Sequence, residues 1–299
     1  MIWGEVTSIL STPHISHRVI IMVAADIPST TAELLYFESP PNGERAYNHI
    51  NVDPKTGERP RNFTQAKHSV TIENLRGKEN TVSLDTTGFQ YYHHPAKHTS
   101  FKNDEEIEKE YYPESIELIK QLTGASKVVL FDHTVRRNRP GELDDGPQKR
   151  QPVAQVHVDQ TPKSAVDRVH RHLPPSEAPE LLKKRFQIIN LWRPISHAAW
   201  DWPLALCDYR SVDPEKDALP VALIYPDREG ETYGIKYNPN HKWVYLRGMT
   251  PEELVLIKCF DSKEDVARFT PHTGFQDPAT PPDAPLRESI ELRALVFYD

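Results

Sequence analysis

Three residues of the sequence have the types and spacing of a metal-binding triad. His157 and Asp159 stand two positions apart in the strand-like segment VAQVHVD, so their side chains share one face of the strand, about 7 Å apart along the backbone. His272 follows far later in the chain, where intervening strands and helices can bring it beside the first two. Two imidazoles and one carboxylate on one side of a metal leave coordination positions open, the arrangement of non-haem Fe(II) oxygenases. We therefore predict that His157, Asp159 and His272 bind Fe(II) and leave room for a cosubstrate and O2.

A second polar group lies on RESIELRALVFY, which is predicted to be the closing strand. Arg287 and Ser289 are two positions apart and therefore point to the same side. A guanidinium with a neighbouring hydroxyl suits one end of a dicarboxylate. We predict that this pair binds the far carboxylate of 2-oxoglutarate, whose keto-acid end would chelate the iron. Arg293 shares the face and competes for the role, but Arg287 ranks first because of its serine.

Substrate contacts are expected where aromatic residues gather around a cation. The segment NLWRPISHAAWDWP combines tryptophans with an arginine, and GFQYYHHPAKHTSF contributes two tyrosines. Aromatic walls with one cation suit a carboxylated apolar substrate. Packing of the tryptophans in the core, with the arginine paired to an internal carboxylate, is an equal alternative. The candidate contacts are Tyr91, Tyr92, Arg136, Trp192, Arg193 and Trp200.

The elements that must position these residues are mostly strands. Strand-like runs occur at RVIIMVA, ELLYFES, HSVTIEN, NTVSLD, KVVLFDH, FQIINLWRPI, PVALIYP, ETYGIKY and KWVYLRG, separated by Pro, Gly and Asn clusters. A helix is predicted over Asn103–Leu122 with an interruption near Pro113, and others from Thr161 and from Ser176. Thr250–Glu253 has the spacing of a capping box, which predicts a helix through LVLIKCF. The charged stretch RRNRPGELDDGPQKRQP is predicted to be a connection that flanks the site.

Composition narrows the class of protein. The 27 prolines in 299 residues disfavour a helix bundle and favour strands joined by ordered loops, in one large domain or two. A net charge of −7, with both signs spread along the chain, argues against a nucleic-acid footprint or a polybasic membrane anchor. The early apolar run VIIMVAA is too short to span a bilayer, and two cysteines build no disulfide framework. We expect a cytoplasmic protein with a small-molecule partner, and the sequence leaves its oligomeric state open.

Several motifs resemble a family of fungal hydroxylases and desaturases that includes gibberellin desaturase-like and cephem-methoxylation-related proteins. They are VHVDQTP, NLWRPI, MTPEELVLIKCFDS, FTPHTGFQDP and RESIELRALVFYD. By position, the resemblance assigns the iron ligands to His157, Asp159 and His272 and the cosubstrate arginine to Arg287. The interval from His272 to Arg287 is longer than in many related enzymes, which keeps Arg293 in consideration.

The resemblance also implies a fold and an activity. The expected fold is mainly β with peripheral helices, a double-stranded β-helix or jelly roll. We expect residues 1–299 to form a single oxygenase domain, with 1–99 as a β-rich N-terminal extension packed on its core. The implied reaction couples decarboxylation of 2-oxoglutarate to hydroxylation, desaturation or ring closure of a small specialised metabolite or amino-acid-derived acid. Ascorbate is the expected reductant in vitro.

Two other function classes remain open at this point. A zinc-dependent hydrolase could use the same His/Asp/His ligands, but it would leave the Arg287–Ser289 pair without a task and would lack a general base. A metal-free β-sandwich binding module is the third class. The sequence contains no G-x-G-x-x-G, G-x-x-x-x-G-K-[ST] or G-x-S-x-G motif, so dinucleotide, P-loop and serine-hydrolase functions have no motif support.

Overall fold

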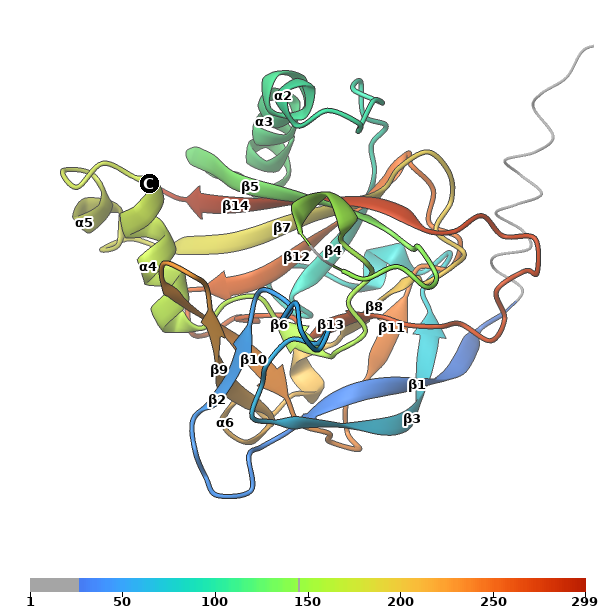
Figure 1. Ribbon diagram of the computed structural model, residues 1–299. Helices are drawn as coiled ribbons and strands as arrows, with labels where there is room; N and C mark the ends of the chain where they lie inside the picture. Colours follow the sequence, from blue (N-terminus) through green and yellow to red (C-terminus); the bar gives the residue numbers. More distant parts are fainter. Residues whose placement is uncertain (1–26, 145) are drawn as a thin grey trace, which may run out of the picture.

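Two β-sheets face each other and enclose the core. The computed structural model describes residues 27–144 and 146–299; the run RVIIMVA, for which the sequence predicts a strand, lies outside these ranges. The first sheet has five strands in the order β4-β12-β7-β14-β5, and the second has nine in the order β1-β3-β11-β8-β13-β6-β10-β9-β2. Figure 1 shows the two sheets as layers, with β6 and β13 in the middle of the molecule.

Each sheet combines long strands with short ones. The five-stranded sheet consists of β4 (Phe89–His93), β12 (Glu253–Asp261), β7 (Phe186–Pro194), β14 (Glu288–Phe297) and β5 (Lys127–Arg137). The nine-stranded sheet consists of β1 (Ser29–Glu38), β3 (Thr64–Asn74), β11 (Trp243–Tyr245), β8 (Leu204–Cys207), β13 (His272–Gly274), β6 (His157–Val158), β10 (Glu229–Ile235), β9 (Ala218–Ile224) and β2 (Ala46–His49). The α-helices are α2 (Asp104–Glu106), α3 (Tyr112–Thr123), α4 (Pro162–His172), α5 (Ala178–Leu181) and α6 (Pro214–Asp217). The other helical segments are the π-helical turn η2 (Ile107–Tyr111) and the 3-10 turns η1 (Glu79–Thr81), η3 (Pro147–Lys149) and η4 (Tyr209–Ser211).

The chain alternates between the sheets in the part that carries the predicted ligands. β5, β7, β12 and β14 belong to the five-stranded sheet, whereas β6, β8, β11 and β13 belong to the other. This alternation is the double-stranded β-helix, so the predicted fold class is confirmed. The strands β1, β3 and β2 extend the edges of the larger sheet, and β4 extends the smaller one.

Helices cover the five-stranded sheet from outside. Apolar residues of η2 and α3, among them Ile107, Leu118 and Ile119, pack against Leu191 and Leu256 on the outer face of the sheet. Because this face is covered by helices and the other by the core, every residue of β7 is buried. Figure 1 shows α2 and α3 above this sheet and α4 with α5 at the end where the chain terminates.

Local signals predicted some elements well and others poorly. The helix over Asn103–Leu122 is present and contains a π-helical turn, Ile107–Tyr111, immediately before the segment with Pro113. α4 begins after Thr161, whose side chain caps it as predicted. The helix expected from Ser176 is shorter and starts at Ala178, and NTVSLD forms the turn η1 and a loop rather than a strand.

The prediction of a helix after Thr250 is wrong. Glu253 does accept a hydrogen bond from the backbone N–H of Thr250 at 2.8 Å, as in a capping box, but the chain then continues as strand β12. Leu254 and Leu256 face the outer helices while Val255 and Ile257 face the core. A strand between two apolar layers therefore takes precedence over the local capping signal.

Candidate metal and cosubstrate site

The three predicted metal ligands converge between the sheets. His157 on β6 pairs directly with His272 on β13, and Asp159 follows β6. One ligand atom from each residue lies within 4.8 Å of the other two, and the imidazole centroids are 4.4 Å apart. Among the described residues no fourth His, Cys, Asp or Glu joins this group. The set can therefore hold a metal ion on one side and leave other positions open.

Backbone carbonyls orient both imidazoles. Nδ1 of His157 donates to the carbonyl of Gln155 at 2.8 Å, and Nδ1 of His272 donates to the carbonyl of Thr270 at 3.0 Å. In each ring Nε2 is left as the nitrogen that can bind a metal. Burial and the neighbouring His157 lower the pKa of His272, which favours the neutral form that metal binding requires.

The carboxylate of Asp159 is held by two further donors. Its Oδ2 accepts hydrogen bonds from Nδ2 of Asn190 at 2.7 Å and from Nε of Arg293 at 3.1 Å, while Oδ1 lies 3.4 Å from Nε2 of His157. Burial opposes the charge, but Arg293 and His157 outweigh it and hold the pKa of Asp159 well below its usual range. One oxygen is thus fixed by protein donors and the other is free for a metal.

Asn190 was not among the predicted site residues. It lies on β7 opposite Arg293 of β14, is fully buried, and its Oδ1 has no hydrogen-bond partner. The sequence did contain a signal for it, because Asn190 is the polar residue in the apolar run IINLW and alternation places it on the same face as Trp192.

The two arginines of the closing strand have different surroundings. Arg293 contacts three carboxylates: those of Asp159, of Asp132 at 3.0 Å from its Nη1, and of Glu291 at 2.5 Å from its Nη2. Although burial opposes its charge, Asp132 and Glu291 raise the pKa of Arg293 well above the ordinary value. The side chain is therefore already occupied by partners of the protein itself.

Arg287 has no such partner among the described residues. It is 2% exposed; its Nε donates to Oγ of Ser289 at 3.2 Å and its Nη1 to the carbonyl of Trp202 at 2.8 Å, and its guanidinium lies 5.2 Å from the ring centroid of Trp192. Burial and then the nearby Arg136 lower its pKa to about 9. A buried cation with neutral contacts can accept an anionic ligand.

A cavity of about 320 Å³ opens onto His157 and Asp159. Arg136 lines it and donates from Nη1 to the carbonyl of Gln151 at 3.0 Å. The charged connection after β5 also reaches the cavity, where Asp144 contacts Arg59 and Arg150, each at 3.1 Å. This stretch therefore flanks the site, as its sequence predicted.

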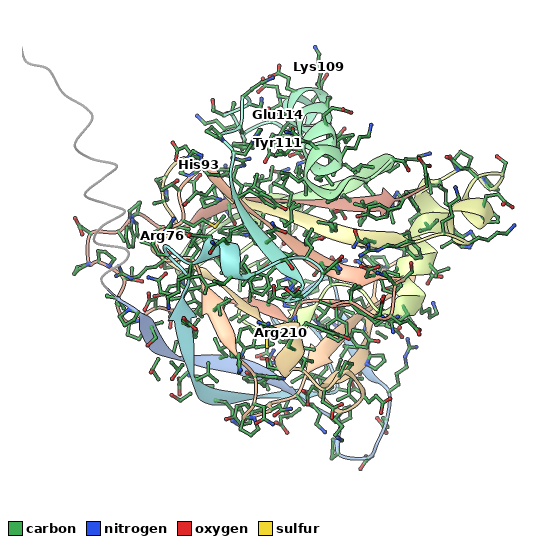
Figure 2. All side chains as sticks on the ribbon, turned by 180° about the vertical axis from the view of Figure 1, so that it is seen from behind. Arg76, His93, Lys109, Tyr111, Glu114 and Arg210 are labelled. Carbon is green, nitrogen blue, oxygen red and sulfur yellow. The ribbon has the colours of Figure 1, made fainter. Side chains whose placement is uncertain are left out.

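The other predicted substrate contacts lie elsewhere. Arg193 is 1% exposed and faces outward, where its Nε donates to the hydroxyl of Tyr111 at 3.1 Å and its Nη1 to two backbone carbonyls. Figure 2 shows Tyr111 on the helical segment that covers the sheet. Tyr92 packs on the same outer face. The expectation that Arg193 meets a substrate carboxylate is corrected, because strand alternation turns it away from the cavity.

The aromatic candidates also do not line the cavity. Tyr91 and Trp192 face inward but form a separate apolar cluster with residues such as Leu246. Trp200 lies under the guanidinium of Arg247, 4.9 Å from its ring centroid. The tryptophans are therefore packing residues, and Trp192 in addition supports Arg287.

Comparison with known proteins identifies the family. The family model described as "Oxidoreductase/YMDC permease-like domain" matches residues 34–297. The chain is 37% identical to hydroxylase/desaturase efuI of Hormonema carpetanum over 77% of this chain and 83% of the relative. It is 32% identical to the Fe(II)/2-oxoglutarate-dependent dioxygenase nvfI of Aspergillus novofumigatus over 88% and 95% of the two chains.

A solved structure has the same fold. The iron and alpha-ketoglutarate-dependent endoperoxidase NvfI superposes with a TM-score of 0.78 at 29% identity, covering 91% of this chain and 98% of that one. These relatives are oxygenases, which favours iron chemistry over a zinc hydrolase or a metal-free binding module. The chain belongs to the fungal hydroxylase/desaturase family and is a non-haem dioxygenase that uses Fe(II), 2-oxoglutarate and O2 to oxidise a small molecule.

Proposed function

We propose that His157, Asp159 and His272 hold the Fe(II) and that Arg287, with Ser289 beside it, binds the distal carboxylate of 2-oxoglutarate. The observation that carries the first part is the convergence of the three ligand atoms within 4.8 Å. The donor set fits the metal, because two imidazoles and a carboxylate are ligands of non-haem iron. Support for the second part comes from the burial of Arg287 without a carboxylate among the described residues.

Arg136 is the second cation at the cosubstrate end. It pairs with Ser289 across β5 and β14, and no ion pair joins it to a carboxylate within 27–144 and 146–299. Burial lowers its pKa. We infer that Arg136 adds positive charge around the carboxylate bound by Arg287, rather than anchoring the substrate as the sequence suggested.

Other residues beside the cavity hold the metal ligands and the neighbouring segments in place. Bound Fe(II) with 2-oxoglutarate and O2 supplies the oxidant that breaks a substrate C–H bond while the cosubstrate becomes succinate and CO2. Asn190 and Arg293 hold Asp159 in place, and the contacts of Asp144 with Arg59 and Arg150 tie together two segments beside the cavity. The placement of one C–H bond then decides between hydroxylation, desaturation and ring closure.

The substrate is proposed to be a small specialised metabolite. The cavity of about 320 Å³ lies at the lower end of the range for ligand sites.

Among the described residues no helix has the length and apolarity needed to cross a membrane. We propose a cytoplasmic location because Cys207 and Cys259 are both free thiols, which suits a reducing compartment.

Succinate formation tests this assignment. The protein is supplied with Fe(II), ascorbate, O2 and 2-oxoglutarate, and wild type is compared with His157→Ala, Asp159→Ala and His272→Ala. We expect succinate from wild type only, and weaker Fe(II) binding in anaerobic titrations of all three variants, with circular dichroism showing that the fold is kept. Unchanged stoichiometric iron affinity in all three variants would remove the assignment.

A further inference from the structure

The walls of the cavity beside His157 and Asp159 differ in chemistry. One wall is apolar and is formed by Phe63 with Val221 and Leu223 of β9. Another part of the lining is charged and includes residues of β5 and α4. A ligand that fills the cavity can therefore contact both apolar and charged side chains.

Three of the five arginines that line the cavity contact carboxylates of the protein. Arg59 and Arg150 share the carboxylate of Asp144, each at 3.1 Å. Arg293 contacts its three carboxylates. Arg136 lies at the cosubstrate end, next to Ser289. The remaining arginine of the cavity is Arg168 of α4.

Arg168 is a half-buried cation without a bound carboxylate among the described residues. Its guanidinium lies 5.1 Å from the ring centroid of Phe131. Burial lowers its pKa, and Asp132 offsets this only in part. Asp132 is itself engaged by Nη1 of Arg293 at 3.0 Å. The charge of Arg168 is thus left available to a ligand in the cavity.

The fold holds this cation at a fixed place relative to the metal ligands. α4 starts directly after the segment Asp159–Gln160, and a capping box between Thr161 and Ser164 fixes its first turn. Ala165 and Val169 are fully buried and anchor the helix. Arg168 therefore cannot be moved far from Asp159 without displacing packed residues.

The aromatic ring beside Arg168, that of Phe131, lies at a β-bulge of β5. The register of β5 against β14 shifts between Asp132 and Leu130, which leaves Phe131 unpaired. Phe131 packs with the inner cluster that includes Phe186 and Ile188, while Asp132 of the next position also faces inward and reaches Arg293. The bulge thus places an aromatic platform and a carboxylate side by side, as bulges near active sites often do.

We propose that Arg168 binds a carboxylate of the substrate while the apolar part of the substrate lies against Phe63, Val221 and Leu223. This assignment rests on the proposed function and adds the substrate class, a small apolar carboxylic acid. A carboxylate matches the planar fork of a guanidinium.

Acid and amide pairs test the proposal before the natural substrate is known. The probes are octanoate and 2-naphthoate, with octanamide and 2-naphthamide as their neutral partners. Binding is measured anaerobically by calorimetry to the Fe(II) protein saturated with 2-oxoglutarate, so that Arg287 is already occupied. In wild type we expect each acid to bind about tenfold or more tightly than its amide, as a charge-assisted contact predicts.

The variants separate this role from general effects of charge. Arg168→Gln should remove the preference for acids, and Arg168→Lys should retain part of it. Arg171→Gln is the matched control, because Arg171 is an exposed arginine of the same helix that does not line the cavity. Succinate formed without substrate, and the affinity for 2-oxoglutarate, should be unchanged in Arg171→Gln.

Two results would overturn the inference while leaving the proposed function intact. One is equal binding of acid and amide by wild type; the other is a preference for acids that survives in Arg168→Gln as it does in Arg171→Gln. If wild type failed to convert 2-oxoglutarate at all, the proposed function itself would be lost, and the assignment of Arg168 with it.

Discussion

Arg287, directly before β14, and Arg293, in the middle of β14, have opposite electrostatic surroundings. Around Arg293, three carboxylates contact one guanidinium. Around Arg287, the guanidinium meets a serine hydroxyl, a backbone carbonyl and an indole ring. The same residue type is therefore paired with carboxylates of the protein in one place, whereas in the other we propose that it binds an anionic ligand.

The two arginines should differ most in their contribution to the free energy of unfolding. Arg293→Ala leaves Asp159, Asp132 and Glu291 without their shared cation, and removal of one partner from a buried charge cluster costs about 3–5 kcal/mol. We expect a loss of that size in the free energy of unfolding of the metal-free protein, measured by urea titration. Arg287→Ala should cost much less, since it removes a buried charge that has no carboxylate partner. Equal losses in the two variants would contradict the comparison.

The order reverses for cosubstrate binding. Arg287→Ala should weaken 2-oxoglutarate binding about thirtyfold, or about 2 kcal/mol, because a charge-assisted contact is lost. Arg293→Ala, or Arg293→Lys if the alanine variant is unstable, should change it far less. 2-Oxovalerate, which lacks the distal carboxylate, serves as control and should bind wild type and Arg287→Ala equally. A greater effect of Arg293 on 2-oxoglutarate affinity would mean that the roles along β14 are exchanged.

Asn190 supports the same proposed metal ligand, Asp159, as Arg293 does. Its Nδ2 donates to Oδ2 of Asp159, the same oxygen that Arg293 contacts, and such supporting contacts typically change metal affinity by about tenfold or more. We expect Asn190→Ala to weaken Fe(II) binding about tenfold in anaerobic titration. The affinity of the iron-loaded protein for 2-oxoglutarate should change little, because Asn190 does not contact Arg287. Unchanged iron affinity would show that Arg293 alone fixes Asp159.

The sequence predicted those parts of the site that depend on spacing along one strand. His157 with Asp159, and Arg287 with Ser289, stand two positions apart, and alternation places each pair on one face. Which face Arg193 takes depends on how β7 is set in the sheet, and the aromatic residues around it suggested the wrong side. The contributions of Phe63 and Arg168 come from distant segments, so only the assembled fold reveals them.

The carboxylate partners of Arg293 could not be predicted from the sequence. Asp132 becomes a partner of Arg293 through the register of β5 on β14 and the bulge at Phe131, neither of which has a local signature.

The prediction of a helix through LVLIKCF was wrong for a related reason. Thr250 and Glu253 form the local contact of a capping box, but the neighbouring strands of the sheet determine the conformation of the next residues.

The N-terminal strands raise the question of domain number. β1 and β3 continue the larger sheet, β4 continues the smaller one, and the parallel pairing of β3 with β11 joins them to the core. We propose that 1–99 is an extension packed on a single oxygenase domain. Limited proteolysis should yield no separate product from this region, and a stable folded fragment ending near Thr99 would show that there are two domains.

The smallest expected effect belongs to Ser289. Its Oγ accepts a hydrogen bond from Nε of Arg287 at 3.2 Å, so it orients the guanidinium and leaves the other nitrogens to a ligand. A net hydrogen bond of this kind is worth about 0.7 kcal/mol, which predicts an approximately threefold weaker binding of 2-oxoglutarate by Ser289→Ala. Ser289→Thr keeps the hydroxyl and should bind nearly as wild type, and neither variant should change iron affinity. If Ser289→Ala were as damaging as Arg287→Ala, the hydroxyl rather than the guanidinium would be the principal contact of the carboxylate, and the different surroundings of Arg287 and Arg293 would not explain cosubstrate binding.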